Sequence, residues 1–194
     1  DWIDRRFVQK FSVLPEMAQD TAPAINPALA SPDTIKEISA IAMRCGGCGA
    51  KVGASVLNRA LSELEPAPRD DILIGLQDPD DAAVVEVPPG KVMVHTVDYF
   101  RSFIDDPYLF GKISANHSLS DIFAMGAEAQ SALAIATVPY GIETKVEETL
   151  RQMMAGAMEM LNDANAALVG GHTSEGAELA LGFSVNGLVD KDKI

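Results

Sequence analysis

Apolar side chains recur at intervals of three and four residues in three segments of the chain, which is the spacing of one helical face. These segments cover residues 56–64, 108–125 and about 143–164. Each of them can bury a stripe of side chains against a neighbouring layer. We therefore predict three amphipathic helices.

Local signals mark the ends of the second helix and the outer face of the third. Asp106 can act as the N-cap, and Pro107 fits the first helical position, where no backbone N–H is needed. Gly126 can adopt the left-handed conformation that ends many helices. In the third helix, Glu147 and Arg151 stand four residues apart, and we expect them to form an ion pair on its outside.

Short runs of β-branched and other apolar residues fill the spaces between these helices. Helices and strands follow one another in a mixed order, and neither GxxxxGK[ST] nor GxGxxG occurs. This order favours an α+β (mixed α/β) domain, with helices packed on one face of a mixed β-sheet, over a doubly wound nucleotide-binding fold. The predicted strands are Ala82–Val87, Val92–Asp98, Ser131–Val138, Ala167–Val169 and Leu179–Val189.

Composition limits the number of domains and the class of partner. The chain has 194 residues, of which 47% are apolar, enough for one folded domain. Residues 1–34 combine an amphipathic stub with a linker rich in Pro and Ala, so we predict that the domain covers residues 35–194. A net charge of −13 argues against nucleic-acid and anionic-membrane partners. Two cysteines make no disulfide framework, and we expect a cytoplasmic protein.

Aspartates stand at the ends of predicted strands and within one helix. Asp80 and Asp81 precede the first strand, and Asp98 ends the second. Asp121 closes a polar run inside an otherwise apolar helix, and such a run faces either water or a site. Carboxylates at the ends of neighbouring strands can converge with one on a covering helix, and Mg²⁺ on a polyphosphate needs one or two of them. Taken singly, each aspartate also fits an exposed turn or a helix cap.

Two glycine-rich segments carry the remaining candidate groups. Lys51 follows the Cys45-Gly46-Gly47-Cys48 loop, where it can neutralise phosphate charge beside loop N–H groups. Gly170 and Gly171 allow close backbone approach, and the following His172 and Thr173 can donate to phosphate; a simple turn explains the run equally well. The cysteine pair fits half a zinc site, a redox pair or a loop with one reactive thiol, although the scattered histidines disfavour zinc.

Five segments together resemble the N-terminal domain of selenide, water dikinase (selenophosphate synthetase), over roughly residues 42–190. Three shorter motifs among them, DDAAV, TVD and SDIFAMGA, are similar to a wider superfamily of aminoimidazole-ribonucleotide synthetase, thiamine-monophosphate kinase and hydrogenase-maturation enzymes. The cysteine–lysine loop, the FRSFIDDPYLFGKI stretch and the GGH run point to the selenide enzyme. The segments are RCGGCGAKVG (44–53), DDAAVV (80–85), TVDYFRSFIDDPYLFGKI (96–113), LSDIFAMGA (119–127) and GGHTSEG (170–176).

The resemblance implies a homodimer, joined through its sheet, that uses ATP and Mg²⁺ to convert selenide and water into selenophosphate, AMP and phosphate. It implies that Cys48 is the reactive thiol and that Lys51 contacts ATP, both as catalytic residues. It also implies that Asp81 and Asp121 bind the metal. The residues that it places at the nucleotide are Lys51, Asp78, Asp80, Asp98, Asp121, Gly171, His172 and Thr173, the last three from the neighbouring subunit.

The chain departs from this family pattern in two places. Ala50 stands where the family often has a second cysteine, and the extra thiol is Cys45 instead. The family's C-terminal domain, which supplies a further metal-binding aspartate, is expected to be missing, so the fragment should be inactive alone. The N-terminal stub resembles the end of a flavin-dependent pyridine-nucleotide-disulfide oxidoreductase module fused upstream.

Two other functions stay open at this point. The first is a small-molecule kinase of the same superfamily, similar to thiamine-monophosphate kinase. The second is a module that only binds nucleotide and dimerises. Dependence of ATP consumption on selenide separates the first from the dikinase, and the oligomeric state tests the second.

Overall fold

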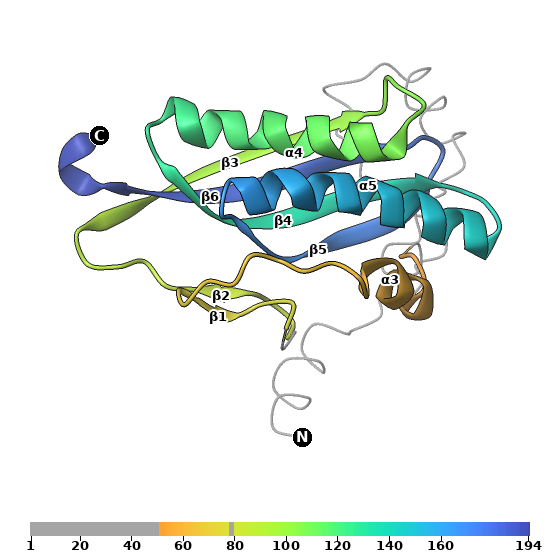
Figure 1. Cartoon of the computed structure of the whole chain (residues 1–194), viewed down its shortest axis with the longest axis horizontal. Helices are drawn as coiled ribbons and strands as arrows, with labels where there is room; N and C mark the ends of the chain where they lie inside the picture. Colours follow the sequence, from red (N-terminus) through yellow and green to blue (C-terminus); the bar gives the residue numbers. More distant parts are fainter. Residues whose placement is uncertain (1–50, 78–79) are drawn as a thin grey trace, which may run out of the picture. The chain divides into compact units, whose positions relative to one another are not determined.

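A computed structural model describes residues 51–77 and 80–194 of the chain (Figure 1). The predicted stub, the linker, the domain boundary at residue 35 and the cysteine loop lie outside the described residues. The elements are α3 (Ala54–Leu61), β1 (Ile72–Ile74), β2 (Val84–Val85), β3 (Lys91–Arg101), α4 (Pro107–Ala124), β4 (Glu128–Pro139), α5 (Glu143–Asp163), β5 (Ala167–Gly176), β6 (Ala180–Asp190) and the short 3₁₀ helix η3 (Lys191–Lys193).

Four strands form a mixed sheet in the order β3-β6-β4-β5, so β3 and β5 are its two edges. The neighbours β3 and β6 are antiparallel, as are β6 and β4. The strands β4 and β5 are parallel, because α5 carries the chain back to the start of the sheet between them. The predicted mixed sheet is therefore confirmed.

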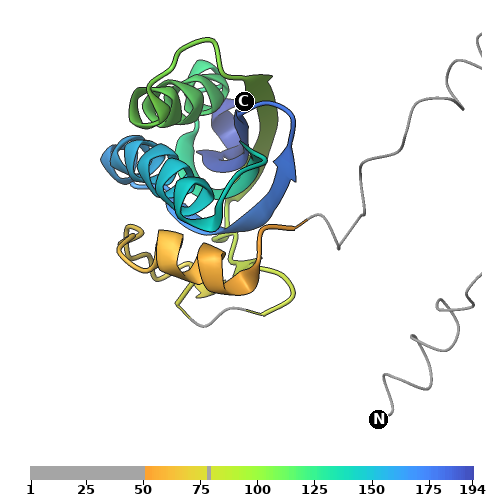
Figure 2. The same cartoon turned by 90° about the vertical axis from the view of Figure 1, so that its right-hand side faces the viewer.

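The helices α4 and α5 cover one face of this sheet (Figures 1 and 2). The predicted start of α4 is confirmed, since Asp106 Oδ1 accepts a hydrogen bond of 3.0 Å from the Leu109 N–H and Pro107 occupies the first turn. Gly126 follows the helix with φ +67°, as expected for a helix stop. The side chains of Phe110, Met153 and Phe183 are completely buried between the helices and the sheet. The predicted arrangement of helices on one face is thus confirmed.

Two glycines allow α4 and α5 to pack backbone against backbone. A Cβ atom on Gly111 would lie 1.9 Å from the carbonyl oxygen of Met153, and one on Gly156 would lie 2.0 Å from that of Tyr108. Neither position can hold a larger side chain unless the helices move apart. The crossing fixes the position of α4 over the sheet.

Two local predictions were wrong, and a third point that the sequence left open is settled by the structure. Arg151 donates two hydrogen bonds to Glu148, at 2.9 and 2.7 Å, while Glu147 accepts one from Arg59 on α3. The expected Glu147–Arg151 pair does not form because tertiary contact with α3 offers Glu147 a better-placed donor. The first predicted strand shrinks to β2, and it pairs with β1, a strand too short to show an alternating pattern. The run from Gly170 to Thr173 continues β5 instead of forming a turn.

Among residues 51–77 and 80–194, no helix has the length and apolar character needed to cross a bilayer.

Candidate functional site

A cavity of about 610 Å³ lies at the β5 edge of the sheet. Its walls come from α3 and α5, from the segment around the β1–β2 pair, and from β4, β5 and β6. Five of the predicted site residues line this cavity, namely Asp80, Asp81, Gly171, His172 and Thr173. The structure therefore brings together groups that are about ninety residues apart in the sequence.

Lys51 lies next to the same strand. It forms an isolated antiparallel bridge with Ser174, and the N–H of Val52 donates to the carbonyl oxygen of Thr173 at 3.3 Å. The Lys51 side chain is exposed. An exposed ammonium group at this position can bind the phosphates of a nucleotide.

The glycines of β5 are required by the backbone itself. Gly171 has φ +155°, and a Cβ atom there would lie 2.1 Å from the carbonyl oxygen of Ala134 on β4. Gly170 has φ +158°. Only glycine adopts such a backbone without strain, so the sequence signal for close approach was correct although the partner is β4. The approach places His172 and Thr173 at the cavity.

A second group of predicted residues lies at the other edge, where α4 packs on β3. The Thr96 hydroxyl donates to Asp121 Oδ2 at 2.6 Å. His117 Nε2 lies 3.9 Å from Asp98 Oδ2, and its ring meets Phe100 edge-on with centroids 5.5 Å apart. Asp121 is exposed and Asp98 is partly buried. Both carboxylates are therefore at least partly accessible to a cation.

Thr96 and His117 were not identified from the sequence, although a signal was present. Thr96 is two residues before Asp98 and therefore lies on the same face of β3. His117 is four residues before Asp121 and therefore lies on the same face of α4. Counting two residues back from Asp98 along the strand and four residues back from Asp121 along the helix would have identified Thr96 and His117.

The two groups do not meet within one chain. Asp98 and Asp121 are absent from the lining of the cavity, and β3 and β5 are opposite edges of the sheet. The expectation that Asp81 and Asp98 stand on neighbouring strands was wrong, because β2 pairs with β1 and β3 pairs with β6. Within the described ranges, no three acidic, histidine or cysteine side chains come close enough to hold a metal. Cys48 and Asp78 lie outside those ranges.

The face of the sheet opposite the helices carries a line of hydroxyl groups from edge to edge. The Tyr99 hydroxyl is 2.8 Å from Thr137 Oγ1, which is 3.4 Å from Ser174 Oγ. Tyr99 reaches Thr137 across β6 at Gly182, where any side chain would collide with the backbone of β3. The flanking side chain of Val97 is 62% exposed and that of Leu133 is 38% exposed. None of the described helices covers this part of the face (Figure 2).

Comparison with known proteins places these features in a family. The family model described as AIR synthase related protein, N-terminal domain, matches residues 79–189. The chain is 41% identical to the selenide, water dikinase of Nitratidesulfovibrio vulgaris (strain DP4), over 77% of this chain and 42% of that protein. It is 38% identical to the selenide, water dikinase of Clostridioides difficile (strain 630), over 77% of this chain and 42% of that protein.

A solved structure shows the same fold. The crystal structure of thiamine-monophosphate kinase from Stenotrophomonas maltophilia K279a matches with a TM-score of 0.56 and 26% identity, over 71% of this chain and 41% of that chain. The chain spans about two fifths of the length of the curated relatives that it matches.

Proposed function

This chain belongs to the family described as AIR synthase related protein, N-terminal domain, and we propose that it is the ATP-binding part of a selenide, water dikinase. The reaction converts ATP, selenide and water into selenophosphate, AMP and phosphate. The observation that carries the proposal is that Asp81 and the β5 residues Gly171–Thr173 line one cavity, with Lys51 bridged to the next residue of β5, Ser174. Similarity to two selenide, water dikinases at about 40% identity supports the choice of substrate.

Each group at the cavity has a physical role in phosphoryl transfer. Lys51 offsets negative charge on the phosphates, and His172 and Thr173 donate hydrogen bonds to phosphate oxygens. The transfer is mainly a matter of positioning and charge neutralisation, so these donors hold the reacting phosphate in line with selenide. Cys48 precedes Lys51 by three residues, and the family resemblance implies that it handles selenium.

The carboxylates fit Mg²⁺ in chemistry and in number. Asp81 and Asp121 present exposed oxygen atoms, and Mg²⁺ in nucleotide sites uses one or two carboxylates together with waters and phosphate oxygens. A closed cage of protein ligands is therefore not needed. When bound, Mg²⁺ would neutralise charge on the ATP phosphates.

We further propose that a complete site needs a second copy of the chain. Asp98 and Asp121 lie at the β3 edge, whereas Gly171–Thr173 lie at the β5 edge. If the uncovered faces of two sheets packed against each other about a twofold axis, the β5 edge of one protomer could lie beside the β3 edge, and so the aspartates, of the other. The exposed Val97 and Tyr99 on the uncovered face would become buried in such a homodimer.

Anaerobic phosphorus NMR with ATP, Mg²⁺ and selenide tests the reaction, using the natural polypeptide that carries these residues. We expect a selenophosphate signal with an equal amount of AMP, and neither product when selenide is omitted. Asp121→Asn should abolish the signal, whereas Asp105→Asn, which removes an exposed carboxylate before the α4 cap, should preserve it. ATP consumption that is independent of selenide would instead support a related kinase, with a fold like that of thiamine-monophosphate kinase.

A mixture of two inactive variants tests the shared site. Asp121→Asn and His172→Ala lie in different groups, so a mixed dimer contains one composite site without either change. Subunit exchange should restore about a quarter of the wild-type rate, because half of the dimers are mixed and each has one intact site. A mixture that stays inactive would show that each site lies within one chain.

We place the reaction in the cytoplasm, in keeping with the few cysteines and the acidic charge.

A further inference from the structure

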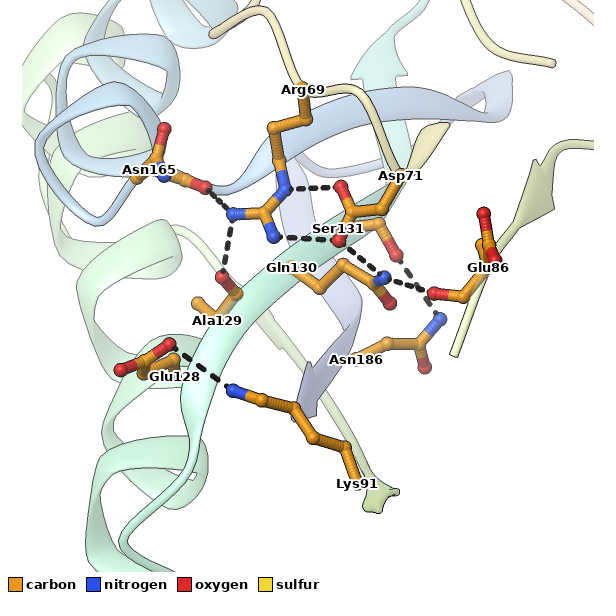
Figure 3. A network of polar contacts seen from close by, with 10 residues as sticks. All are labelled: Arg69, Asp71, Glu86, Lys91, Glu128, Ala129, Gln130, Ser131, Asn165 and Asn186. Carbon is orange, nitrogen blue, oxygen red and sulfur yellow. Dashed lines mark hydrogen bonds and ion pairs between the residues drawn. The ribbon is translucent and has the colours of Figure 1, made fainter. Parts of the chain in front are cut away.

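The base of the β1–β2 pair is held by a polar network that joins four segments of the chain (Figure 3). The guanidinium of Arg69 donates two hydrogen bonds to the Asp71 carboxylate, each 2.8 Å long. It also donates to the carbonyl oxygen of Asn165 at 2.7 Å and, at 3.4 Å, to that of Ala129. Arg69 thus ties the residues before β1 to the start of β4 and to the turn before β5.

Gln130 on β4 completes the network. Its side chain is completely buried, and Nε2 donates to Asp71 Oδ2 at 2.8 Å and to the carbonyl oxygen of Glu86 at 2.7 Å. The Glu86 N–H in turn donates to the carbonyl oxygen of Asp71 at 2.8 Å. The Gln130 amide group therefore binds both the residue just before β1, Asp71, and the residue just after β2, Glu86.

One acceptor atom of Gln130 is buried without a hydrogen bond, which lowers the stability of the fold. Gln130 Oε1 is the one buried side-chain polar atom without a hydrogen bond among residues 51–77 and 80–194. Leucine would fit a similar volume without that cost. The amide is therefore better explained by the two bonds that its nitrogen makes than by packing alone.

The ion pair in this network is the least exposed one in the described part of the chain. The side chains of Arg69 and Asp71 are 17% and 18% exposed. Hydrogen bonds from Arg69 hold the pKa of Asp71 below its ordinary value, against the opposing effect of burial. Asp71 is consequently charged at neutral pH, and the two-pronged contact with the planar guanidinium has a fixed direction.

The network lies beside the cavity. Val85 and Ser131 line the cavity, and they are the sequence neighbours of Glu86 and Gln130. Asp81 is five residues before Glu86, so it can lie at most about 18 Å from that anchor. The β1–β2 pair forms a sheet of its own, without a ladder to the four-stranded sheet. The position of Asp80 and Asp81 over the sheet thus depends on how the base of this pair is fixed.

We propose that Arg69, Asp71 and Gln130 are positioning residues that hold the β1–β2 pair so that Asp80 and Asp81 face the cavity. They touch neither aspartate and act through the backbone at Asp71 and Glu86. The consequence for nucleotide binding rests on the proposed function. The mechanical part, in which the network fixes the pair, stands independently of it.

Hydrogen exchange of Gln130→Leu tests the mechanical part. Amides in residues 72–77 and 80–86 should exchange about tenfold faster or more, because two hydrogen bonds to the base are lost, whereas those of β3 and β6 should stay unchanged. Arg151→Gln is the control, since it also removes two side-chain hydrogen bonds, but on the outside of α5, and it should leave residues 72–86 unchanged. Equal acceleration across all strands, or none in the pair, would overturn the proposal. Asp71→Asn, which keeps the side-chain volume, gives the same comparison if Gln130→Leu fails to fold.

Titration with ATP in the presence of Mg²⁺ tests the consequence. If the wild-type chain binds, Gln130→Leu should bind about tenfold more weakly and Arg151→Gln should bind equally well. A Gln130→Leu chain with faster local exchange and unchanged affinity would overturn the positioning role. If the wild-type chain does not bind ATP, the proposed function fails for this chain, and the exchange pattern alone decides whether the network fixes the pair.

Discussion

Gly111 lies where α4 crosses α5, and replacing it by alanine tests whether this crossing positions α4. The added Cβ atom would lie 1.9 Å from the carbonyl oxygen of Met153 and 3.0 Å from the backbone nitrogen of Ala157. Both neighbours are backbone atoms of α5, so no side-chain rotation relieves the clash. The helices must separate, and α4 carries Asp121 with it.

The size of the effect follows from this geometry. Real Cβ contacts are essentially never shorter than 3.0 Å, so the 1.9 Å contact must lengthen by about 1.1 Å. Overpacking of this kind costs about 1–3 kcal/mol, and a rigid backbone neighbour places Gly111→Ala at the upper end. Alanine is the better helix former by about 1 kcal/mol. We therefore expect a net loss of about 2 kcal/mol in the free energy of unfolding, or about 4–8 °C in Tm.

Urea unfolding followed by circular dichroism measures this difference. Gly141→Ala is the matched control, because its Cβ atom would meet nothing nearer than 3.8 Å, and we expect it to stay within about 0.5 kcal/mol of wild type. If Gly111→Ala were as stable as Gly141→Ala, the close crossing of α4 and α5 would be refuted as a constraint on the fold.

Three further predictions follow from single contacts. Thr96→Val removes the hydroxyl that donates to Asp121 while keeping the β-branched shape. Mg²⁺-dependent ATP affinity, measured by calorimetry, should fall about fivefold, while the midpoint of urea unfolding should stay the same. A shifted midpoint with unchanged affinity would contradict this role of Thr96. Gly171→Ala would bring a Cβ atom within 2.1 Å of the Ala134 carbonyl oxygen, and we expect a loss of about 1–3 kcal/mol in urea unfolding, whereas wild-type stability would show that β5 can move freely. The pKa of Asp71 is lowered in the folded chain, so the charged carboxylate contributes fully to the free energy of unfolding above its ordinary pKa, and this contribution is lost as the pH falls further. The difference in the free energy of unfolding between wild type and Asp71→Asn should therefore shrink below about pH 4. A difference that stays constant with pH would exclude the ion pair as its source.

Local sequence signals were enough to predict the two helices that cover the sheet. The limits of α4 were readable from Asp106, Pro107 and Gly126, because a cap, a fixed φ angle and a left-handed stop act within one helical turn. The limits of α5 were readable within one residue from its apolar spacing. The motifs at residues 80–85, 119–127 and 170–176 also indicated the family, which the comparisons confirm.

Which of these groups lie close together depends on long-range packing, which local sequence signals do not reveal. In the ladder between β3 and β6, for example, Lys91 is the register partner of Asp190. Such strand pairing joins segments about one hundred residues apart and does not follow from local propensity. For the same reason β1 was missed, and Glu147 was assigned to Arg151 although Arg59 reaches it from α3. Strand order then separates Asp121 from His172 across the width of the sheet, because only long-range packing sets the order in which strands pair.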